Sequence, residues 1–267
     1  MGIADDKPWD IRKLGWSKST GSMATDGVYM KTEHIIDGKK HYLKLSNYDS
    51  YRGIYGHESV NELIASRLGE MLGFNVPAGE LKKSLVRIDG NDYEAYVFLS
   101  ASYKITESRV SFENFYVDHR LSTEESPLDF CRRYSWESEI YKMFIFDYLI
   151  INRDRHGANL EVLKNSENRL SPLFDNGLSF ACSCVQVGDL ETFDIMADRP
   201  VNSFIGEKRL ARNLALIDRK LQFNELRAST RDILFKDLTG VLHERYYDVI
   251  WDIILRRWQN VKKFRIA

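Results

Sequence analysis

Hydrophobic and polar positions alternate over much of the first hundred residues, which is typical of strands. Four segments carry this alternation: Val28 to Ile36, His41 to Leu45, Leu81 to Ile88 and Tyr93 to Leu99. Asp37-Gly38 separates the first two segments, and Asp89-Gly90-Asn91-Asp92 separates the last two. Both are turn sequences, because glycine tolerates positive φ. The pattern therefore predicts two antiparallel hairpins.

A helical pattern lies between these hairpins. Its apolar residues fall on one helical face: Val60, Leu63, Ile64, Leu68, Met71 and Leu72. Gly73 suits a helix C-terminus, and Pro77 prevents the helix from continuing. The order hairpin, helix, hairpin follows.

The pattern changes after Ser100. Ser135 is expected to cap a helix from about Trp136 to Ile151, which is apolar nearly all round and should be buried. The remaining expected elements are a hairpin and two helices: strands Leu160 to Leu163 and Leu170 to Phe174, and helices Phe204 to Asp218 and Leu238 to Phe264. We therefore expect an α+β protein with a small β-rich lobe over residues 1–100 and a larger, mainly helical lobe over residues 101–267.

Composition narrows the class of protein. The 267 residues carry 38 basic and 39 acidic side chains, for a net charge of -1, so nucleic acid is not expected as the main partner. Three cysteines give no disulfide framework. The N-terminus lacks a signal-peptide pattern, and no apolar run approaches the ~20 residues that span a bilayer. A cytoplasmic location is expected, with secretion without a cleaved signal left open.

The strongest local signal for chemistry follows the apolar helix, in the run from Asn152 to Asn159. Asp154 precedes Asn159 by five positions. In phosphoryl transfer, one carboxylate orients the attacking hydroxyl and accepts its proton, while an amide oxygen binds magnesium. The alternative explanation of this run is a structural one, a polar turn that caps the helix. Asp147, inside the apolar helix, is expected to bond the backbone of this loop rather than to react.

A second signal is Leu173-Phe174-Asp175-Asn176-Gly177. Two apolar residues would hold Asp175 at a buried strand end, and Gly177 would let the chain turn away. A carboxylate in that position can bridge magnesium ions to the β- and γ-phosphates of a nucleotide. The alternative is an ordinary Asp-Asn-Gly turn.

Lys44 is the third signal, because strand alternation directs it to one face and a lysine in a phosphate cleft contacts the α- and β-phosphates. Glu58 or Glu62 of the following helix should pair with it, and Glu62 is preferred. A fourth, weaker signal is the polar run from Ser17 to Ser22, in which Ser19, Gly21 and Ser22 are expected to cradle phosphates. Its hydroxyls are also candidate self-phosphorylation sites.

Together, Asp154-Arg155-His156-Gly157-Ala158-Asn159 and Phe174-Asp175-Asn176-Gly177 resemble the HipA-like kinases, particularly their short CtkA-like members. Phosphatidylinositol 3- and 4-kinases share much of this pattern. The resemblance implies a bilobal protein-kinase-like fold, ATP with Mg²⁺, and phosphorylation of serine or threonine on a protein substrate, often including autophosphorylation.

Carried over by position, Asp154 resembles the catalytic base, Asn159 and Asp175 resemble the metal ligands, and Lys44 resembles the nucleotide lysine. The hinge against the adenine would follow Tyr96-Val97-Phe98-Leu99, near Ser100 to Tyr103, with Leu99 reaching the adenine. His156 is placed on the nucleotide side of the cleft. Residues 180–204, with their mildly acidic run, would form part of the acceptor side and favour a basic peptide.

Two alternatives stay open from the sequence. One is a lipid or small-molecule kinase, for which the basic and aromatic segment from Arg256 to Arg265 would face a membrane. A solvated C-terminal helix explains that segment equally. The other is a nucleotide-binding pseudokinase that serves as an interaction module, although such a module has no need of Asp154, Asn159 and Asp175 together.

Overall fold

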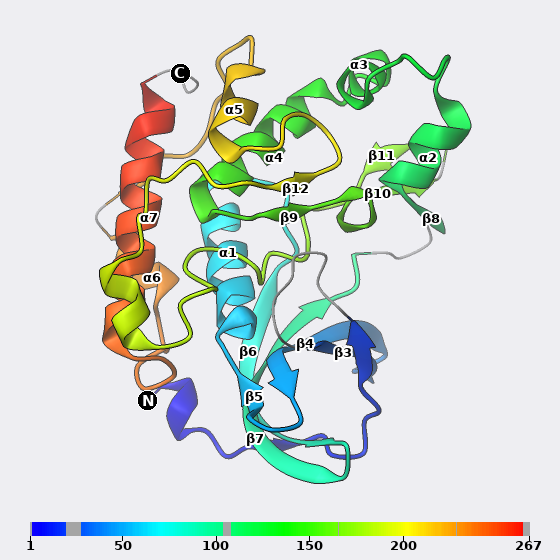
Figure 1. The fold of residues 1–267 in the computed structure, drawn as a ribbon. Helices are drawn as coiled ribbons and strands as arrows, with labels where there is room; N and C mark the ends of the chain where they lie inside the picture. Colours follow the sequence, from blue (N-terminus) through cyan, green and yellow to red (C-terminus); the bar gives the residue numbers. More distant parts are fainter. Residues whose placement is uncertain (1, 20–27, 104–107, 165, 228, 264–267) are drawn as a thin grey trace.

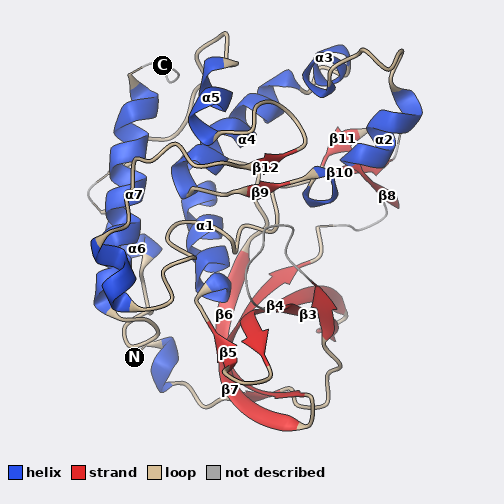
Figure 2. Ribbon diagram, in the orientation of Figure 1, coloured by secondary structure: helices blue, strands red, loops and turns tan. Residues whose placement is uncertain are grey.

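The computed structural model describes residues 2–19, 28–103, 108–164, 166–227 and 229–263. A β-rich lobe lies below a mainly helical lobe in Figure 1. In Figure 2 the strands of the large sheet gather in the lower part and most helices in the upper and left parts. The expected α+β class is confirmed.

The small lobe is built on a seven-stranded sheet with the order β1-β6-β7-β4-β3-β2, and β5 pairs with β4. Its strands are β1 (Trp9–Asp10), β2 (Ser17–Ser19), β3 (Val28–Ile36), β4 (Lys39–Asp49), β5 (Gly53–Tyr55), β6 (Gly79–Ile88) and β7 (Asn91–Ala101). A 3-10 helix, η1 (Ile3–Asp5), precedes them. The β3–β4 and β6–β7 hairpins confirm the two predicted from the sequence.

Two-residue turns close these hairpins. Asp37 and Gly38 have φ of 50° and 73°, and Asp89 and Gly90 have φ of 49° and 84°. Positive φ at both central positions matches the strand twist and fixes the register. Asn91 already belongs to β7, so the second turn is shorter than the four residues expected.

Helix α1 (Glu58–Leu72) packs on this sheet and confirms the predicted helix. Gly73 ends it in the left-handed conformation, with φ of 83°. Along β4, Leu43 and Leu45 point into a small hydrophobic cluster inside the lobe. Strand alternation therefore turns Lys44 to the other face, toward α1.

The large lobe contains six helices among its described residues: α2 (Phe112–His119), α3 (Pro127–Arg133), α4 (Glu137–Ile150), α5 (Leu210–Ala215), α6 (Thr230–Leu234) and α7 (Glu244–Lys262). Its short strands are β8 (Ser108–Ser111), β9 (Asp154–Arg155), β10 (Glu161–Lys164), β11 (Arg169–Leu170) and β12 (Asn202–Ser203). Two further 3-10 helices are η2 (Gly157–Asn159) and η3 (Val187–Glu191).

Several predicted boundaries were wrong. Ser135 does not cap α4: it has φ of 58°, and Trp136 is the N-cap residue. The helix expected over Phe204 to Asp218 is limited to α5, after Gly206 turns the chain at φ of 86°. Strand β11 ends before Pro172, because proline has no N–H for a ladder. The helix expected from Leu238 begins only at Glu244.

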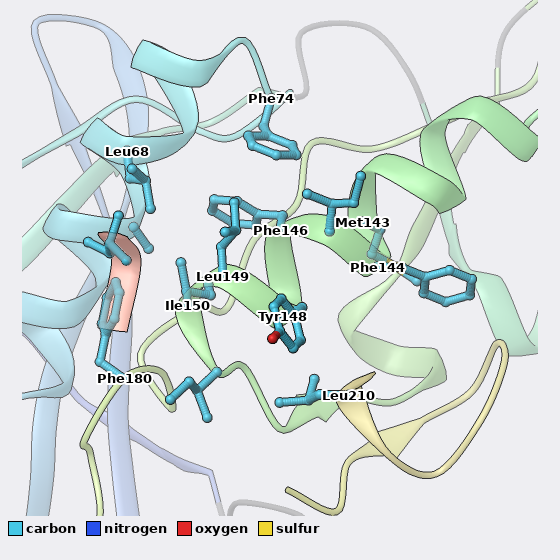
Figure 3. Packing of buried hydrophobic residues seen from close by; sticks show 14 of the residues in the cluster. Leu68, Phe74, Met143, Phe144, Phe146, Tyr148, Leu149, Ile150, Phe180 and Leu210 are labelled. Atoms are coloured by element: carbon cyan, nitrogen blue, oxygen red, sulfur yellow. The ribbon is translucent and has the colours of Figure 1, made fainter. Parts of the chain in front are cut away.

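The main hydrophobic core joins α1 to the large lobe. Figure 3 shows labelled side chains of α4 together with Leu68 of α1, Phe74, Phe180 and Leu210, which all belong to this core. The buried residues on all faces of α4 confirm the central helix that its sequence predicted. No helix of the described residues is long and apolar enough to pass through a bilayer.

Candidate active site

A cleft between the lobes collects most of the predicted site residues. It consists of two adjoining cavities with volumes of about 320 and 270 Å³. Lys44, Glu62 and Asp175 line both of them. The larger cavity is also lined by Asp154, His156 and Asn159. Residues that lie up to 131 positions apart in the sequence thus meet in one place.

Lys44 connects the two lobes. Its Nζ donates to Glu62 Oε1 of α1 at 2.5 Å and to Asp175 Oδ1 of the large lobe at 2.8 Å. The expected pairing with Glu62 is confirmed. Burial alone would lower the pKa of Lys44, but the charges of Asp175 and Glu62 outweigh it and raise that pKa above its ordinary value. The ammonium group is therefore permanently charged at the cleft.

The same ion pair acts on Asp175. Burial would raise the pKa of Asp175, yet the charge and hydrogen bond of Lys44 hold that pKa below its ordinary value. Asp175 is thus an anion in the cleft, and its side chain keeps 39% exposure. That exposure leaves carboxylate surface available to a cation.

The catalytic-loop residues are held by short-range contacts. Asn159 Nδ2 donates to the backbone oxygen of Asp154 at 2.8 Å, which leaves Asn159 Oδ1 as the atom able to bind a cation. His156 Nδ1 accepts the N–H of Ala158 at 3.1 Å, so its proton resides on Nε2. That Nε2 lies 3.8 Å from Asp154 Oδ1. His156 therefore faces the Asp154 carboxylate.

Arg155 joins the two predicted motifs, and its side chain has no solvent exposure. Its guanidinium forms a two-point contact with Asp147, with Nη2 to Oδ1 at 2.8 Å and Nε to Oδ2 at 3.1 Å. Nη1 donates to the backbone oxygen of Phe174 at 2.7 Å, and Nη2 donates to Asn176 Oδ1 at 2.8 Å. A buried charge is stable only with such partners.

This arrangement fixes Asp175, because Arg155 bonds the residue on either side of it. Asp175 has φ of 62°, in the left-handed region that residues other than glycine seldom occupy. Gly177 lies in a turn, as we predicted, although its φ is not positive. It also permits close approach to α1: a Cβ at this position would lie 3.2 Å from the Cβ and the backbone oxygen of Glu58.

Asp147 also differs from expectation. Its carboxylate bonds side chains rather than the loop backbone: besides Arg155, it accepts Asn152 Nδ2 at 3.0 Å. Asn152 Oδ1 in turn accepts the N–H of Asp154 at 3.2 Å. The series of hydrogen bonds that links α4 to the catalytic loop is therefore continuous and buried.

The smaller cavity has an apolar wall. Tyr42, Pro77, Phe98, Tyr103 and Phe174 line it. Leu99 does not, which corrects its expected place beside the adenine: it is 1% exposed and packs in the cluster inside the small lobe. Strand alternation turns Phe98 to the cleft and its neighbour away from it.

A polar group closes one edge of the cleft. Tyr103 donates to Glu161 Oε2 at 2.8 Å, and Arg109 donates to Glu161 Oε1. The ring of Tyr103 stacks on Phe174, with centroids 6.0 Å apart. Burial, followed by the charge of Glu161, raises the pKa of Tyr103. The sequence pattern did not indicate the contacts with Glu161, since 52 positions separate it from Arg109.

The expected phosphate loop is only partly described. Ser17 lines the smaller cavity, and Ser19 is the last residue of β2. Gly21 and Ser22 lie outside the described residues.

Two adjacent buried titratable residues begin α1. Burial lowers the pKa of His57 to about 4, and its Nε2 contacts the oxygen of Ala181 at 3.2 Å. Burial raises the pKa of Glu58 to about 7, and Glu58 Oε2 accepts the N–H of Asn47 at 3.1 Å. Glu58 lines the larger cavity. The sequence showed Glu58 only as a rival partner for Lys44.

The donor atoms in the larger cavity fit magnesium. Among the described residues, no group of three or more His, Cys, Asp or Glu side chains could hold a metal alone. Magnesium in nucleotide sites uses only one or two protein oxygens, with phosphates and water as the other ligands. The Asp175 carboxylate and Asn159 Oδ1 are oxygens of this kind.

The C-terminal helix presents only part of the expected basic and aromatic face: Arg256, Lys262 and Lys263 are exposed, and Phe264 and Arg265 lie outside the described residues. Arg257 has no exposure and Trp258 has 3%, and both pack inside the large lobe. The segment therefore follows the amphipathic pattern of an ordinary packed helix.

Comparisons with known proteins show which solved structures this chain resembles. No protein-family description matches the chain, and no curated protein matches it either. Among solved structures, the chain is similar to the Helicobacter pylori proinflammatory kinase CtkA, with a TM-score of 0.56 and 13% identity over 94% of both chains. It also matches HipA of Shewanella oneidensis MR-1, from a complex with HipB and operator DNA, with a TM-score of 0.47 and 15% identity over 98% of this chain and 69% of that one.

The likeness to CtkA confirms the bilobal kinase-like fold predicted from the sequence. At 13% identity this likeness establishes the fold alone, so the chemistry has to be argued from the site residues. The resemblance to phosphatidylinositol kinases stays a prediction.

Proposed function

We propose that this chain is an ATP- and magnesium-dependent phosphotransferase, specifically a serine/threonine protein kinase of the HipA/CtkA-like kind that also phosphorylates itself. One observation carries the proposal: Lys44, Asp154, Asn159 and Asp175 line a single cleft between a β-rich and a helical lobe. The kinase-like fold supports it. The cleft's apolar wall suits an adenine ring, and its charged end suits phosphates.

Each residue has a role that follows from its surroundings. Lys44 would contact the phosphates of a bound nucleotide, since Glu62 holds its ammonium group at the cleft. Asp175 and Asn159 Oδ1 would hold magnesium, which would offset the negative charge of the phosphates. Arg155 keeps both ligands at a fixed separation, because it donates to the backbone oxygens of Asn159 and of Phe174, which precedes Asp175.

Asp154 positions the acceptor hydroxyl and accepts its proton at a carboxylate oxygen. His156, with its proton on Nε2, faces that carboxylate and limits its rotation. The bond between the γ-phosphorus and the bridging oxygen breaks as the acceptor oxygen attacks in line, so no covalent enzyme intermediate is required.

The test is label transfer from γ-labelled ATP with Mg²⁺ to the protein itself and to a panel of serine and threonine peptides. Asp154→Ala and Asp175→Ala are each expected to reduce transfer by at least about 100-fold, with unchanged circular dichroism. Full transfer by both variants would contradict the assigned roles. Nucleotide binding without any transfer by the wild-type protein would favour a pseudokinase instead.

A further inference from the structure

The segment that follows Asp175, residues 176–184, is bonded to helix α1 through its backbone carbonyl groups. Asn61 of α1 supplies two of these contacts, because its Nδ2 donates to the backbone oxygens of Gly177 and Ser179, each at 3.0 Å. Asn61 and Ser179 both have 0% exposure, so water cannot readily replace the second bond. The spacing between the helix and the segment therefore depends on this side chain.

The amide of Asn61 has one orientation that fits these contacts. Turned over, it would place Oδ1 against two carbonyl oxygens, which are acceptors as well. In the observed orientation Oδ1 is buried and, within the described part of the chain, has no hydrogen-bond partner. An unpaired buried acceptor costs free energy, so the two bonds from Nδ2 have to outweigh that cost. Asn61 thus acts as a double donor to the segment.

Two further contacts place the segment along the same end of α1. Nε2 of His57, the residue before the helix, contacts the backbone oxygen of Ala181 at 3.2 Å. At Gly177 the chain approaches the helix so closely that a Cβ would lie 3.2 Å from the Cβ and the backbone oxygen of Glu58. The start of α1 therefore contacts every second residue of the segment from 177 to 181.

The same stretch of α1 holds Lys44. Asn61 is adjacent to Glu62, whose carboxylate accepts Lys44 Nζ at 2.5 Å. Lys44 Nζ also donates to Asp175 Oδ1 at 2.8 Å. The contacts close a ring: Lys44 joins Asp175 to α1, and Asn61 joins α1 to the chain two residues after Asp175. Moving either α1 or Asp175 alone would break bonds of this ring.

We propose that Asn61 is a positioning residue for Asp175. It makes α1 and the segment after Asp175 move as one unit, so the carboxylate keeps its place before a nucleotide binds. Arg155 fixes Asp175 within the large lobe, whereas Asn61 fixes it relative to the helix that holds Lys44. The inference rests on the proposed function for the role of Asp175 as a magnesium ligand. Groups that orient a metal ligand are typically worth about 10- to 100-fold in metal affinity or activity.

The first test is hydrogen–deuterium exchange of the full chain without nucleotide, which requires no activity. Asn61→Leu keeps the approximate size of the side chain and removes both donor groups. Peptides that cover residues 57–62 and 176–184 should then exchange faster together, by at least about 10-fold, because local opening no longer has to break these bonds. Peptides from the middle of α4 should exchange as before.

The second test measures metal binding. Mn²⁺ is titrated in the presence of a non-hydrolysable ATP analogue, and free Mn²⁺ is followed by electron paramagnetic resonance. Asn61→Leu should raise the dissociation constant of Mn²⁺ by about 10- to 100-fold. In label transfer, excess Mg²⁺ should restore most of the lost rate, since Asn61 touches no reacting group. A general loss of folded protein would not be reversed in this way.

Gly177→Ala acts on the same spacing from the other side. The φ of Gly177 is not positive, so alanine brings no left-handed backbone strain, but its Cβ crowds Glu58. This variant should also weaken Mn²⁺ binding, although less than Asn61→Leu does. The double variant should lose less than the two single losses combined, because both changes disturb one contact. Fully independent losses would contradict the proposal.

Asn224→Leu is the matched control. Asn224 Nδ2 donates to the backbone oxygen of Met71 at 2.9 Å, at the opposite end of α1, and the residue is exposed. This variant should leave exchange at residues 176–184 and Mn²⁺ binding unchanged. The same unchanged results for Asn61→Leu, in either measurement, would overturn the proposal.

Failure of the proposed function is distinguishable from failure of the role of Asn61. If the wild-type protein binds no Mn²⁺ with the nucleotide, the proposed function fails and the metal-positioning role fails with it, while exchange still decides whether Asn61 joins α1 to the segment. Normal metal binding by a folded Asn61→Leu variant overturns the positioning role alone. If circular dichroism shows that Asn61→Leu does not fold, Gly177→Ala decides, and wild-type Mn²⁺ binding by that variant overturns the proposal.

Discussion

The two sides of the cleft are held in different ways. On the large-lobe side, Arg155 and Asp147 form a fully buried, two-point contact that also fixes the backbone next to Asn159 and Asp175. On the small-lobe side, Lys44 is held by an ion pair to Glu62 and reaches across to Asp175, with 20% of its side chain exposed. The contacts on the large-lobe side are therefore fixed, whereas a bound phosphate can replace the contacts of Lys44 on the small-lobe side.

The large-lobe side therefore positions the catalytic residues, and the small-lobe side serves to bind the nucleotide. A buried charge network resists change, because removing either partner leaves an unpaired charge in the interior. The Lys44–Asp175 contact joins the two lobes in a partly solvent-exposed cleft, so breaking it should cost less free energy. We therefore expect substitutions on the large-lobe side to act on stability and activity together, and those on the small-lobe side mainly on activity.

The largest effect is expected for Arg155→Gln. It leaves Asp147 as a buried, poorly paired carboxylate, which should reduce the free energy of unfolding by about 3–5 kcal/mol and abolish label transfer. Urea unfolding followed by circular dichroism measures the first effect.

Arg231→Gln is the control for that experiment, since its ion pair with Asp248 is exposed and should contribute no more than about 1 kcal/mol. Equal, small losses for both variants would mean that the Arg155 network does not anchor the loop.

Lys44→Met is expected to reduce transfer by about 100- to 1,000-fold, because a positioned charge at the phosphates is lost. Its cost in unfolding free energy should be smaller, about 1–3 kcal/mol, from the unpaired Glu62 carboxylate. Adding Glu62→Gln should restore much of this stability without restoring transfer. A double variant that recovers both would show that Lys44 only supports the fold.

The free energy of unfolding is expected to depend on pH through Glu58, the first residue of α1. The pKa of Glu58 is about 7 in the folded protein against an ordinary 4.5, so the folded state binds more protons in this interval. Stability should then fall as pH rises from 4.5 through 7, by at most about 3 kcal/mol. Glu58→Gln should remove this loss, as thermal unfolding from pH 4.5 to 8 would show.

His57 provides the internal check for that series. Its pKa is about 4 against an ordinary 6.5, so the unfolded state binds more protons and stability falls as pH drops from 6.5 to 4. Glu58→Gln should leave this acid-side loss in place. Identical pH profiles for the wild-type protein and Glu58→Gln would show that Glu58 is not buried as described.

The sequence predicted those parts of the fold that local rules determine. The hairpins at Asp37-Gly38 and Asp89-Gly90, the end of α1 at Gly73 and the burial of α4 all follow from turn chemistry and periodicity. The pairing of Lys44 with Glu62 followed from strand alternation and helix spacing. The fold class rested on the motifs around Asp154 and Asp175.

Tertiary contacts determine what was missed. Leu99 was assigned to the cleft by its position, but the sheet turns it inward and Phe98 outward. The role of Arg155 depends on Asp147 and Asn176, which lie on different elements. A lone Asp in an apolar helix, followed eight residues later by Arg, was the available signal.

The most direct test of the proposed site is a crystal structure with Mn²⁺ and a non-hydrolysable ATP analogue, in which anomalous scattering locates the metal. The account predicts a metal on the order of 2.1 Å from a carboxylate oxygen of Asp175 and from Asn159 Oδ1, with the α- and β-phosphates on Lys44. A nucleotide bound elsewhere, or a metal that contacts neither Asn159 nor Asp175, would contradict it.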